Sequence, residues 1–479
     1  MFRLSRRSAL GLLAAPLTMG VAGSALAAVR DDGAITFEST TFKLRDGTEL
    51  PVERGTFHVP ENRGDPASRR IAIGFIRFRS TNPRPGAPIV YLAGGPGGSG
   101  IDTARGPRQP VFLALRAVAD VIAFDQRGTG LSNTIPPVAA PAAFDTALTL
   151  SETADTAYFR ATLERALPAW KAARVSINGY TTVESADDLE ALRKGLGVPR
   201  IDLWSISYGT HLALAAMRRH PHGIGRVAMS SVEGLDQTVK LPARLDLAME
   251  RICAASGDPG LATTMRRVHA RFDAEPQAMS VALPNGAKAA FTTDSYPLRL
   301  MAGAIPKNPG GIPRLAQMYG ALDKGAYDPV APLIHGNFLL RPLSLSGMSD
   351  AMDIASGITD AKLALVNAQA PHSFLGRATN MPMPQMRYAI PGIDLGDAYR
   401  RELTSSIPAL VFSGDLDIRT PLEEQAEATE GLSRAHHIRV RNGGHDLYEA
   451  HPDMAAILSA FFSGRAVTTT ELSLPAPAH

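Results

Sequence analysis

Hydrophobic and polar positions alternate along this chain with two different periods. Short apolar runs that end in Gly, Asn or Asp predict buried strands, and longer stretches with apolar residues every three or four positions predict helices. The pattern favours strands at 70–78, 88–92, 121–124, 202–206, 227–232, 407–414 and 437–440. From Pro88 to about Val232 these strands alternate with helical stretches. Such alternation is typical of a mostly parallel sheet with helices on both faces.

The regions on either side of this alternation have different patterns. Residues 28–80 contain further strands, and Asp46-Gly47 is typical of a hairpin turn. Helical pieces interrupted by proline and glycine dominate residues 237–400. We therefore predict a core made of residues 28–236 and 401–465, a largely helical cap at 237–400 inserted before the last strands, and a frayed tail at 466–479.

The run from Asp202 to His211 is the most informative stretch. A short apolar strand leads into Ser205-Ile206-Ser207-Tyr208-Gly209, and a helix with small residues follows. This order is typical of a nucleophile elbow, a turn so tight that its central serine projects above the sheet. We predict Ser207 as the nucleophile, because a turn centred on Ser205 would place the bulky Leu203 at a position that needs a small residue.

An acyl-transfer serine needs an acid and a base, which in this architecture follow it in the order Ser, Asp or Glu, His. A buried strand ends just before Asp415 and Asp417, and we choose Asp417 because the loop must first leave the strand. The alternative is that both are solvated loop aspartates. His445 follows two glycines after the next short strand, and its imidazole is suited to take the serine proton and return it. The predicted catalytic residues are therefore Ser207, Asp417 and His445.

A glycine-rich loop at 93–100 follows the strand at 88–92. Glycines let backbone N–H groups approach a substrate with no side chain between them. We predict an oxyanion hole formed by the N–H of Tyr208 and an N–H of Gly94 or Gly95. A phosphate-binding loop is not indicated, because no Lys-Ser/Thr pair follows the glycines.

A polar turn, Asp125-Gln126-Arg127-Gly128-Thr129-Gly130-Leu131-Ser132, follows the strand at 121–124. We interpret Asp125 and Arg127 as an internal ion pair that shapes this turn, with a catalytic role as the alternative. His211 and Cys253 are interpreted as packed residues rather than reactive ones.

Together these motifs resemble the α/β-hydrolase superfamily, and more narrowly the proline iminopeptidase and tripeptidyl aminopeptidase branch of serine peptidases. That branch typically has His-Gly-Gly-Pro-Gly, Asp-Gln-Arg-Gly-x-Gly-x-Ser and Gly-x-Ser-Tyr-Gly. The match covers roughly 40–235 and 400–465, with Ala93 in place of the loop histidine and Ser205 in place of the first elbow glycine. The resemblance implies the α/β-hydrolase fold and hydrolysis of an amide or ester through an acyl-serine intermediate, with no metal and no organic cofactor.

We expect a serine exopeptidase that releases N-terminal residues from short peptides. Such an enzyme must bind a cationic amine, and a partly desolvated carboxylate is suited to that task. Glu233, at the end of the strand at 227–232, is the candidate, with a solvated loop glutamate as the alternative. The alternative function is a carboxylester hydrolase with an apolar acyl pocket, because the same triad serves both reactions. A non-catalytic binding protein on this scaffold is disfavoured by the complete triad.

Length and composition limit the remaining possibilities. A chain of 479 residues with 45% hydrophobic content is large enough for one or two domains. Residues 1–27 contain Arg6-Arg7, an apolar run and Ala25-Leu26-Ala27, which is typical of a twin-arginine secretory signal. We therefore expect export to the periplasm or beyond the cell.

Charge limits the classes of partner, and the cysteine content and motifs limit disulfides and metal sites. Without the three arginines of residues 1–27, the chain carries 46 basic and 46 acidic residues. This balance indicates neither nucleic acid nor an anionic membrane as a partner. The partner that the resemblance implies is a small peptide or ester substrate. Cys253 is the only cysteine, so no intrachain disulfide is possible. No His-Glu-x-x-His or Cys-x-x-Cys motif indicates a metal site.

Overall fold

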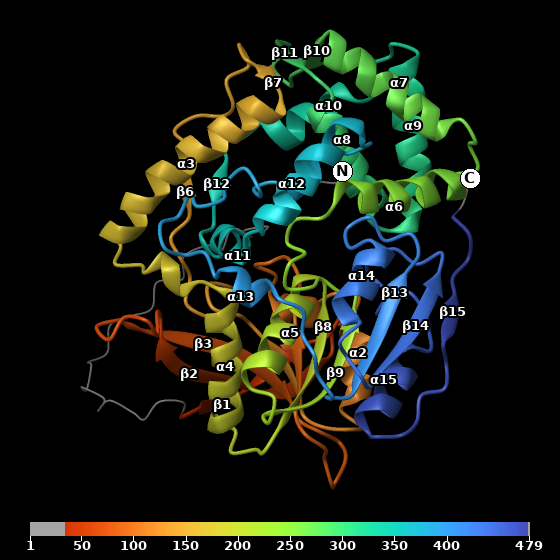
Figure 1. The fold of residues 1–479 in the computed structure, drawn as a ribbon. Helices are drawn as coiled ribbons and strands as arrows, with labels where there is room; N and C mark the ends of the chain where they lie inside the picture. Colours follow the sequence, from red (N-terminus) through yellow and green to blue (C-terminus); the bar gives the residue numbers. More distant parts are fainter. Residues whose placement is uncertain (1–33, 478–479) are drawn as a thin grey trace.

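The computed structural model describes residues 34–477, so the predicted secretory signal at 1–27 lies outside the described residues. One ten-stranded sheet forms the lower half of the molecule (Figure 1). Its strands, in spatial order, are β1 (Thr36–Lys43), β2 (Glu49–Pro60), β3 (Arg70–Phe78), β5 (Val121–Phe124), β4 (Ile89–Leu92), β8 (Ile201–Ile206), β9 (Ile224–Ser230), β13 (Ala409–Gly414), β14 (Ala435–Arg441) and β15 (Glu471–Ser473).

The sheet has an antiparallel edge and a parallel body. Strands β1, β2, β3 and β5 pair antiparallel in that order. From β5 through β4, β8, β9, β13 and β14 to β15, every neighbouring pair is parallel. The mostly parallel sheet predicted from the alternation of strands and helices is therefore confirmed.

Helices cover both faces of the parallel body, which explains why its central strands are buried along their whole length. Every residue of β4, β5 and β8 is buried, as parallel strands covered on both faces require. Alternate residues of β4 enter two separate cores: Val90 and Leu92 lie in one, Ile89 and Tyr91 in the other. The covering helices are α1 (Gly100–Arg105), α2 (Gln109–Leu115), α4 (Thr182–Gly195), α5 (Tyr208–Arg219), α14 (Leu422–Thr429) and α15 (Met454–Phe462).

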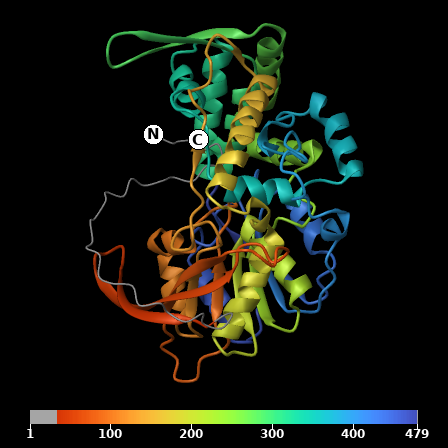
Figure 2. The same ribbon diagram turned by 90° about the vertical axis from the view of Figure 1, so that its left-hand side faces the viewer.

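A second, mainly helical layer lies above the sheet (Figure 1). Within 237–400 it contains α6 (Pro242–Ala255), α7 (Leu261–Ala274), α8 (Tyr296–Ala304), η2 (Ile305–Lys307), η3 (Pro309–Gly311), α9 (Ile312–Asp323), α10 (Ala331–Ile334), α11 (Met348–Ser356), α12 (Asp360–Gln369) and α13 (Asp397–Arg400). It also contains a hairpin, β10 (Gln277–Ala282) and β11 (Lys288–Thr293), which the sequence analysis did not predict. Figure 2 shows this hairpin extending from the top of the molecule.

A segment that the sequence analysis assigns to the core also enters this upper layer. The short strands β6 (Val138–Ala139) and β7 (Thr149–Leu150) pair with β12 (Ser344–Leu345) and β11. Helix α3 (Glu152–Ala172) follows them and rises beside the upper layer (Figure 1). The domain boundary at 236/237 stays a prediction, and the upper layer draws on residues from both sides of it.

The chain end differs from the prediction. Residues 471–473 are not frayed, because they form β15, which pairs in parallel with β14 at the edge of the sheet. Leu472 packs into a core and is only 8% exposed. The tail was predicted as frayed because its threonines, prolines and alanines give a weak strand pattern, whereas the open edge of β14 supplies the missing hydrogen-bond partners.

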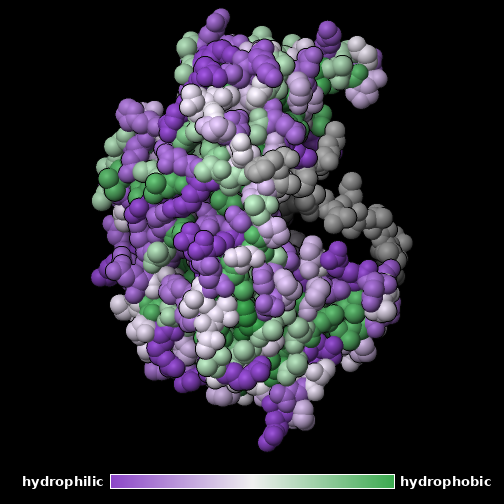
Figure 3. All heavy atoms as spheres, turned by 90° about the vertical axis from the view of Figure 1, so that its right-hand side faces the viewer, coloured by the Kyte–Doolittle hydropathy of each residue, from purple (hydrophilic) through white to green (hydrophobic). Residues whose placement is uncertain are grey.

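Hydrophilic residues are spread over most of the face drawn in Figure 3, with hydrophobic ones in small groups between them. Within residues 34–477, no helix has the length and apolar character that crossing a bilayer requires. The large hydrophobic side chains instead fill three cores, two against the sheet and one in the upper layer.

Candidate active site

The upper layer covers the carboxyl edge of the parallel strands. Loops that follow β4, β5 and β14 all contact it, so closely that a Cβ on Gly97, Gly128 or Gly444 would lie 3.4, 2.8 or 2.6 Å from its nearest upper-layer atom. In open α/β sheets this edge is where ligands bind. The predicted site residues follow β4, β8, β9, β13 and β14, and therefore share it.

Ser207 occupies the tight turn between β8 and α5. Its backbone has φ 55° and ψ −132°, a strained conformation for a residue with a side chain. Two residues later, a Cβ on Gly209 would lie 2.2 Å from the Leu92 carbonyl oxygen, so the helix approaches β4 as only glycine permits. At the first small position, the Ser205 hydroxyl donates to the Ala228 carbonyl at 3.2 Å, which accommodates the departure from glycine. The local structure is that of the predicted elbow.

Asp417 and His445 form a buried pair. The Nδ1 atom of His445 lies 3.0 and 2.9 Å from the two carboxylate oxygens of Asp417, and the residues are 5% and 1% exposed. Because a carboxylate only accepts, Nδ1 carries the proton of the neutral ring, and Nε2 is left with a lone pair that suits a general base.

The loop after β13 holds Asp417 in its ionised form. The N–H groups of Arg419 and Thr420 donate to Oδ1 at 2.8 and 3.0 Å, and the Thr420 hydroxyl donates to Oδ2 at 2.8 Å. Burial alone raises the pKa of Asp417, but the charge that His445 carries when protonated and the hydrogen bonds of His445 and Thr420 outweigh it and lower the pKa below its ordinary value. Asp417 is therefore an anion suited to stabilise an imidazolium.

The end of β9 connects the serine with the histidine. The Ser207 N–H donates to the Ser230 carbonyl at 3.1 Å, and the Ser231 hydroxyl donates to the His445 carbonyl at 2.8 Å. Among the described residues, no hydrogen bond joins the Ser207 hydroxyl to the His445 ring. Such bonds are often long before a substrate binds and shorten in the complex. The structure thus joins Asp417 to His445 directly, and joins Ser207 to them through neighbouring residues.

The glycine-rich loop lies against the elbow. A Cβ on Gly94 would be 2.9 Å from the Ser207 Cβ and 3.5 Å from its Oγ, so no larger residue fits there. Among the described residues, the backbone N–H groups of Gly94, Gly95 and Tyr208 have no hydrogen-bond acceptor. Unpaired N–H groups beside a serine are what an oxyanion hole requires.

Asp125 and Arg127 both lie inside the protein, but not as the pair that the sequence suggested. Asp125 accepts the Ser99 hydroxyl and the Leu131 N–H, both at 2.7 Å, and so shapes its own turn. Arg127 instead binds Asp188 of α4, at 2.8 and 2.7 Å. The predicted partner was wrong because the two side chains of one tight turn point in different directions, Asp125 toward donors in its own turn and in the loop after β4, and Arg127 toward an acceptor on α4.

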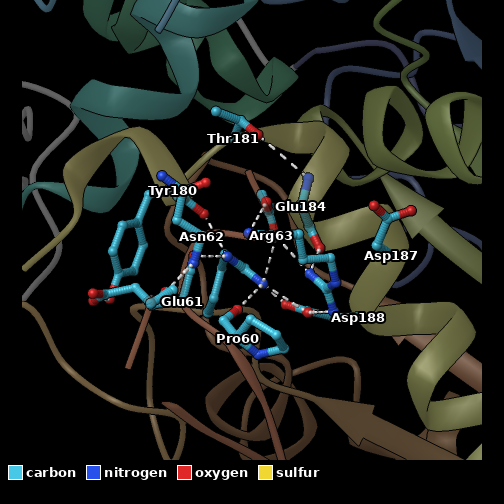
Figure 4. A network of polar contacts seen from close by, with 12 residues as sticks. Pro60, Glu61, Asn62, Arg63, Tyr180, Thr181, Glu184, Asp187 and Asp188 are labelled. Atoms are coloured by element: carbon cyan, nitrogen blue, oxygen red, sulfur yellow. Dashed lines mark hydrogen bonds and ion pairs between the residues drawn. The ribbon is translucent and has the colours of Figure 1, made fainter. Parts of the chain in front are cut away.

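Asp188, the partner of Arg127, belongs to a larger polar network, in which Figure 4 labels Arg63, Glu184 and Asp188. Arg63 donates to Asp188 at 2.7 Å and to Glu184 at 2.5 Å. The backbone carbonyl of Glu61 accepts from Arg127 at 2.6 Å. These residues join the end of β2 to α4, and they contain none of the predicted catalytic groups.

Glu233 is not a solvated loop residue. It is 5% exposed, and its Oε2 atom lies 2.6 Å from Nζ of Lys240, which is also buried. Its N–H donates to the Thr210 hydroxyl of the elbow helix at 2.8 Å. Lys240 therefore already provides a cation for this carboxylate, and a substrate amine would have to share the carboxylate with Lys240. Recognition of a substrate amine by Glu233 stays a prediction.

Two residues interpreted as packed are buried. His211 has its Nδ1 2.9 Å from the Gly234 carbonyl and its Nε2 2.6 Å from the Tyr399 hydroxyl, and burial lowers its pKa. Cys253 is 5% exposed, and burial raises the pKa of its thiol to about 12. Within 34–477, no group of three or more His, Cys, Asp or Glu residues has an arrangement that would hold a metal ion.

Sequence reasoning missed the residues that hold Asp417 and His445. Thr420 orients Asp417, and Ser231, with φ 54°, anchors the backbone of His445. The sequence indicates only that Thr420 and Pro421 precede a helix. For Ser231 it indicates only a place near the end of the strand at 227–232. No spacing rule connects either residue to the groups that it contacts.

Comparison with known proteins bears on the fold. The family model for the alpha/beta hydrolase fold matches residues 87–452. The chain belongs to this family. The predicted fold of this α/β-hydrolase is therefore confirmed by its family as well as by its sheet.

The α/β-hydrolase also resembles curated peptidases over part of its length. A tripeptidyl aminopeptidase of Streptomyces lividans is 30% identical over 193 residues, which are 38% of this chain and 35% of that protein. The serine protease Hip1 of Mycobacterium bovis is 28% identical over 179 residues, which are 36% of this chain and 34% of that protein. The predicted resemblance to this branch is confirmed, although the chain spans only about a third of the length of these relatives.

Among solved structures, a proline iminopeptidase-related protein from Thermus thermophilus aligns with 86% of this α/β-hydrolase and 96% of its own chain. The two are 17% identical, with a TM-score of 0.37.

Proposed function

We propose that this α/β-hydrolase is a serine exopeptidase that releases N-terminal residues from short peptides through an acyl-serine intermediate. The observation that carries the proposal is the buried Asp417–His445 pair at the strand edge that also holds the strained Ser207 turn. The names of the aminopeptidase and protease relatives support a peptide substrate.

The proposed reaction begins with proton transfer from the Ser207 hydroxyl to Nε2 of His445 as the serine oxygen attacks the substrate carbonyl. The N–H groups of Tyr208 and of Gly94 or Gly95 would stabilise the oxyanion, and Asp417 the imidazolium. The imidazolium returns its proton to the leaving amine, and the C–N bond breaks. Water then gives a proton to His445 and attacks the acyl carbon of the acyl-serine. The bond between that carbon and the Ser207 oxygen breaks, and His445 returns the proton to the serine oxygen, which releases the acid and the free serine.

Labelling by a fluorophosphonate tests the mechanism. This probe should modify Ser207 in the wild type and leave Ser207→Ala unlabelled, as measured by peptide mass spectrometry. A folded wild type that stays unlabelled would refute Ser207 as the nucleophile. A panel of aminoacyl amides and short-chain aryl esters then tests the substrate class. Turnover of esters without amide cleavage would refute the exopeptidase proposal and favour the alternative, a carboxylester hydrolase.

We also infer that the chain is exported by a twin-arginine route to the periplasm or beyond the cell. The support is the sequence of residues 1–27, with Arg6-Arg7 before an apolar run. A fusion of this segment to a reporter should be exported, and exchange of Arg6 and Arg7 for lysine should retain it inside. Export of the lysine variant at the wild-type level would refute the route.

A further inference from the structure

The loop that carries His445 is in contact with the upper layer as well as with the sheet. Its partner is the turn between α8 and α9, residues 305–311, here named the docking turn. The His445 N–H donates to the Lys307 carbonyl at 2.8 Å. The next residue, Asp446, donates its N–H to Oδ1 of Asn308 at 3.0 Å and accepts from Nδ2 of Asn308 at 2.9 Å.

The backbones of these two segments are too close for a side chain between them. A Cβ on Gly444 would lie 2.6 Å from the Lys307 carbonyl oxygen and 2.8 Å from both the Asn308 Cα and the Pro309 Cδ. Three successive residues, 444 to 446, thus contact the docking turn. The contact is an interlocked backbone interface and not a single side-chain bond.

Charge strengthens the same contact. Nζ of Lys307 lies 2.9 Å from Oδ2 of Asp446. Burial alone raises the pKa of Asp446, but the charges of Lys307 and His445 and the hydrogen bonds of Asn308 and Lys307 lower it far below its ordinary value. On the sheet side, Arg108 lies 3.7 Å from Oδ1 of Asp446. Asp446 is therefore an ionised group between the docking turn and the histidine.

Each part of His445 is held by a different element. Its ring binds Asp417 after β13, its carbonyl binds Ser231 after β9, and its N–H binds Lys307 in the upper layer. The first two attachments belong to the sheet. The third alone makes the position of the histidine depend on the upper layer.

We propose that Lys307 and Asn308 are positioning residues, which fix the loop of His445 so that its ring reaches Ser207. This inference rests on the proposed function, because it takes His445 as the base. It follows that the catalytic centre is complete only while the upper layer is docked on the sheet. A displacement of the base of about 1 Å can slow catalysis on the order of 100-fold.

The test separates this role from substrate binding by the upper layer. In Asn308→Asp, two carboxylates would face each other where the amide now donates to Asp446. The double variant Asn308→Asp/Asp446→Asn restores that hydrogen bond with donor and acceptor exchanged. Arg267→Ala is the matched control, because it removes an ion pair to Asp323 within the upper layer, away from the histidine loop.

The measurements are kcat and KM for a small aryl acetate and the rate of fluorophosphonate labelling. We expect kcat and the labelling rate of Asn308→Asp to fall about 10- to 100-fold with little change in KM, as a misplaced base requires. The double variant should recover most of that loss, and Arg267→Ala should match the wild type.

Labelling of folded Asn308→Asp at the wild-type rate, or a rise in KM alone, would overturn the positioning role. If Asn308→Asp does not fold, Asn308→Ala takes its place, with the same expected loss and the same contradicting result. Failure of the proposed function is distinct from either outcome, because the wild type itself would then remain unlabelled at Ser207.

Discussion

At the scale of single residues, the surroundings of two neighbouring aspartates distinguish their roles. Asp417 is buried and accepts from His445, Arg419 and Thr420, whereas Asp415 pairs only loosely with Arg439, at 3.4 Å. Asp417 therefore has a fixed geometry, whereas Asp415, two positions earlier in the same loop, has a partner at the surface. An amide in place of each therefore has unequal consequences.

We expect Asp417→Asn to lower kcat by roughly 10⁴-fold, because an amide does not stabilise the imidazolium and favours the wrong ring tautomer. Asp415→Asn is the matched control, and its kcat should stay within about a factor of two, because its partner is the half-exposed Arg439 and not a predicted catalytic group. Steady-state kinetics on one substrate compares them. Equal losses in the two variants would contradict the assignment of the acid.

Glu233 gives a second prediction at this scale. If Glu233 recognises the substrate amine, Glu233→Gln should lower kcat/KM for free-amine peptides about tenfold relative to N-blocked ones, as loss of a charge-assisted bond implies. Lys240→Met keeps the carboxylate and removes its internal cation, so it should leave this preference intact. An unchanged ratio in Glu233→Gln, with both variants less stable, would assign Glu233 to the Lys240 pair alone.

At the scale of elements, β8 carries a buried carboxyl group, that of Asp202, at the end far from the elbow. Asp202 accepts the Arg226 N–H at 2.7 Å, and burial raises its pKa from 3.8 to about 7. Because the folded-state pKa is the higher one, the unfolded chain loses this proton first as the pH rises. Stability contributed by the protonated form is therefore present below pH 3.8 and lost by about pH 7.

Asp202→Asn keeps the acceptor oxygen for Arg226 and removes the titration. We expect the Tm of the variant minus the Tm of the wild type to increase as the pH rises from about 4 to about 7. Above about pH 7 this difference should stay constant. Thermal unfolding at a series of pH values measures it. A difference independent of pH across this range would show that Asp202 does not titrate there.

The elements found from the sequence are those whose pattern is local. Strands β4 and β5 are uninterrupted apolar runs, and the predictions of Ser207, Asp417 and His445 came from the ends of the strand patterns at β8, β13 and β14. The hairpin of β10 and β11 was missed because most of its side chains are at least partly exposed and its residues are small or polar. Asn308 and Asp446 lie 138 positions apart, so only tertiary packing joins them.

At the scale of the whole molecule, a buried polar network and the docking turn join parts that the sheet alone leaves separate. The docking turn binds the upper layer to the histidine loop. The network in Figure 4 joins β2 and the turn after β5 to α4. Arg127 and Asp188 are fully buried within it, in contrast to Arg69 at its edge, whose side chain is 42% exposed.

Because removal of one partner leaves the other charge buried and uncompensated, Asp188→Asn should reduce the free energy of unfolding by about 3–5 kcal/mol. Lys194→Ala, on the same helix, removes an exposed partner of Glu190, which keeps its pair with Arg193, and should change that free energy by about 0–1 kcal/mol. Urea midpoints compare the two, and active-site labelling gives the active fraction. Since the network contains no predicted catalytic group, the folded Asp188→Asn should keep its kcat. Equal midpoints would show that Glu184, whose carboxylate lies 3.3 Å from Arg127, compensates for the lost negative charge. A lower kcat at full labelling would extend the role of the network to the active site.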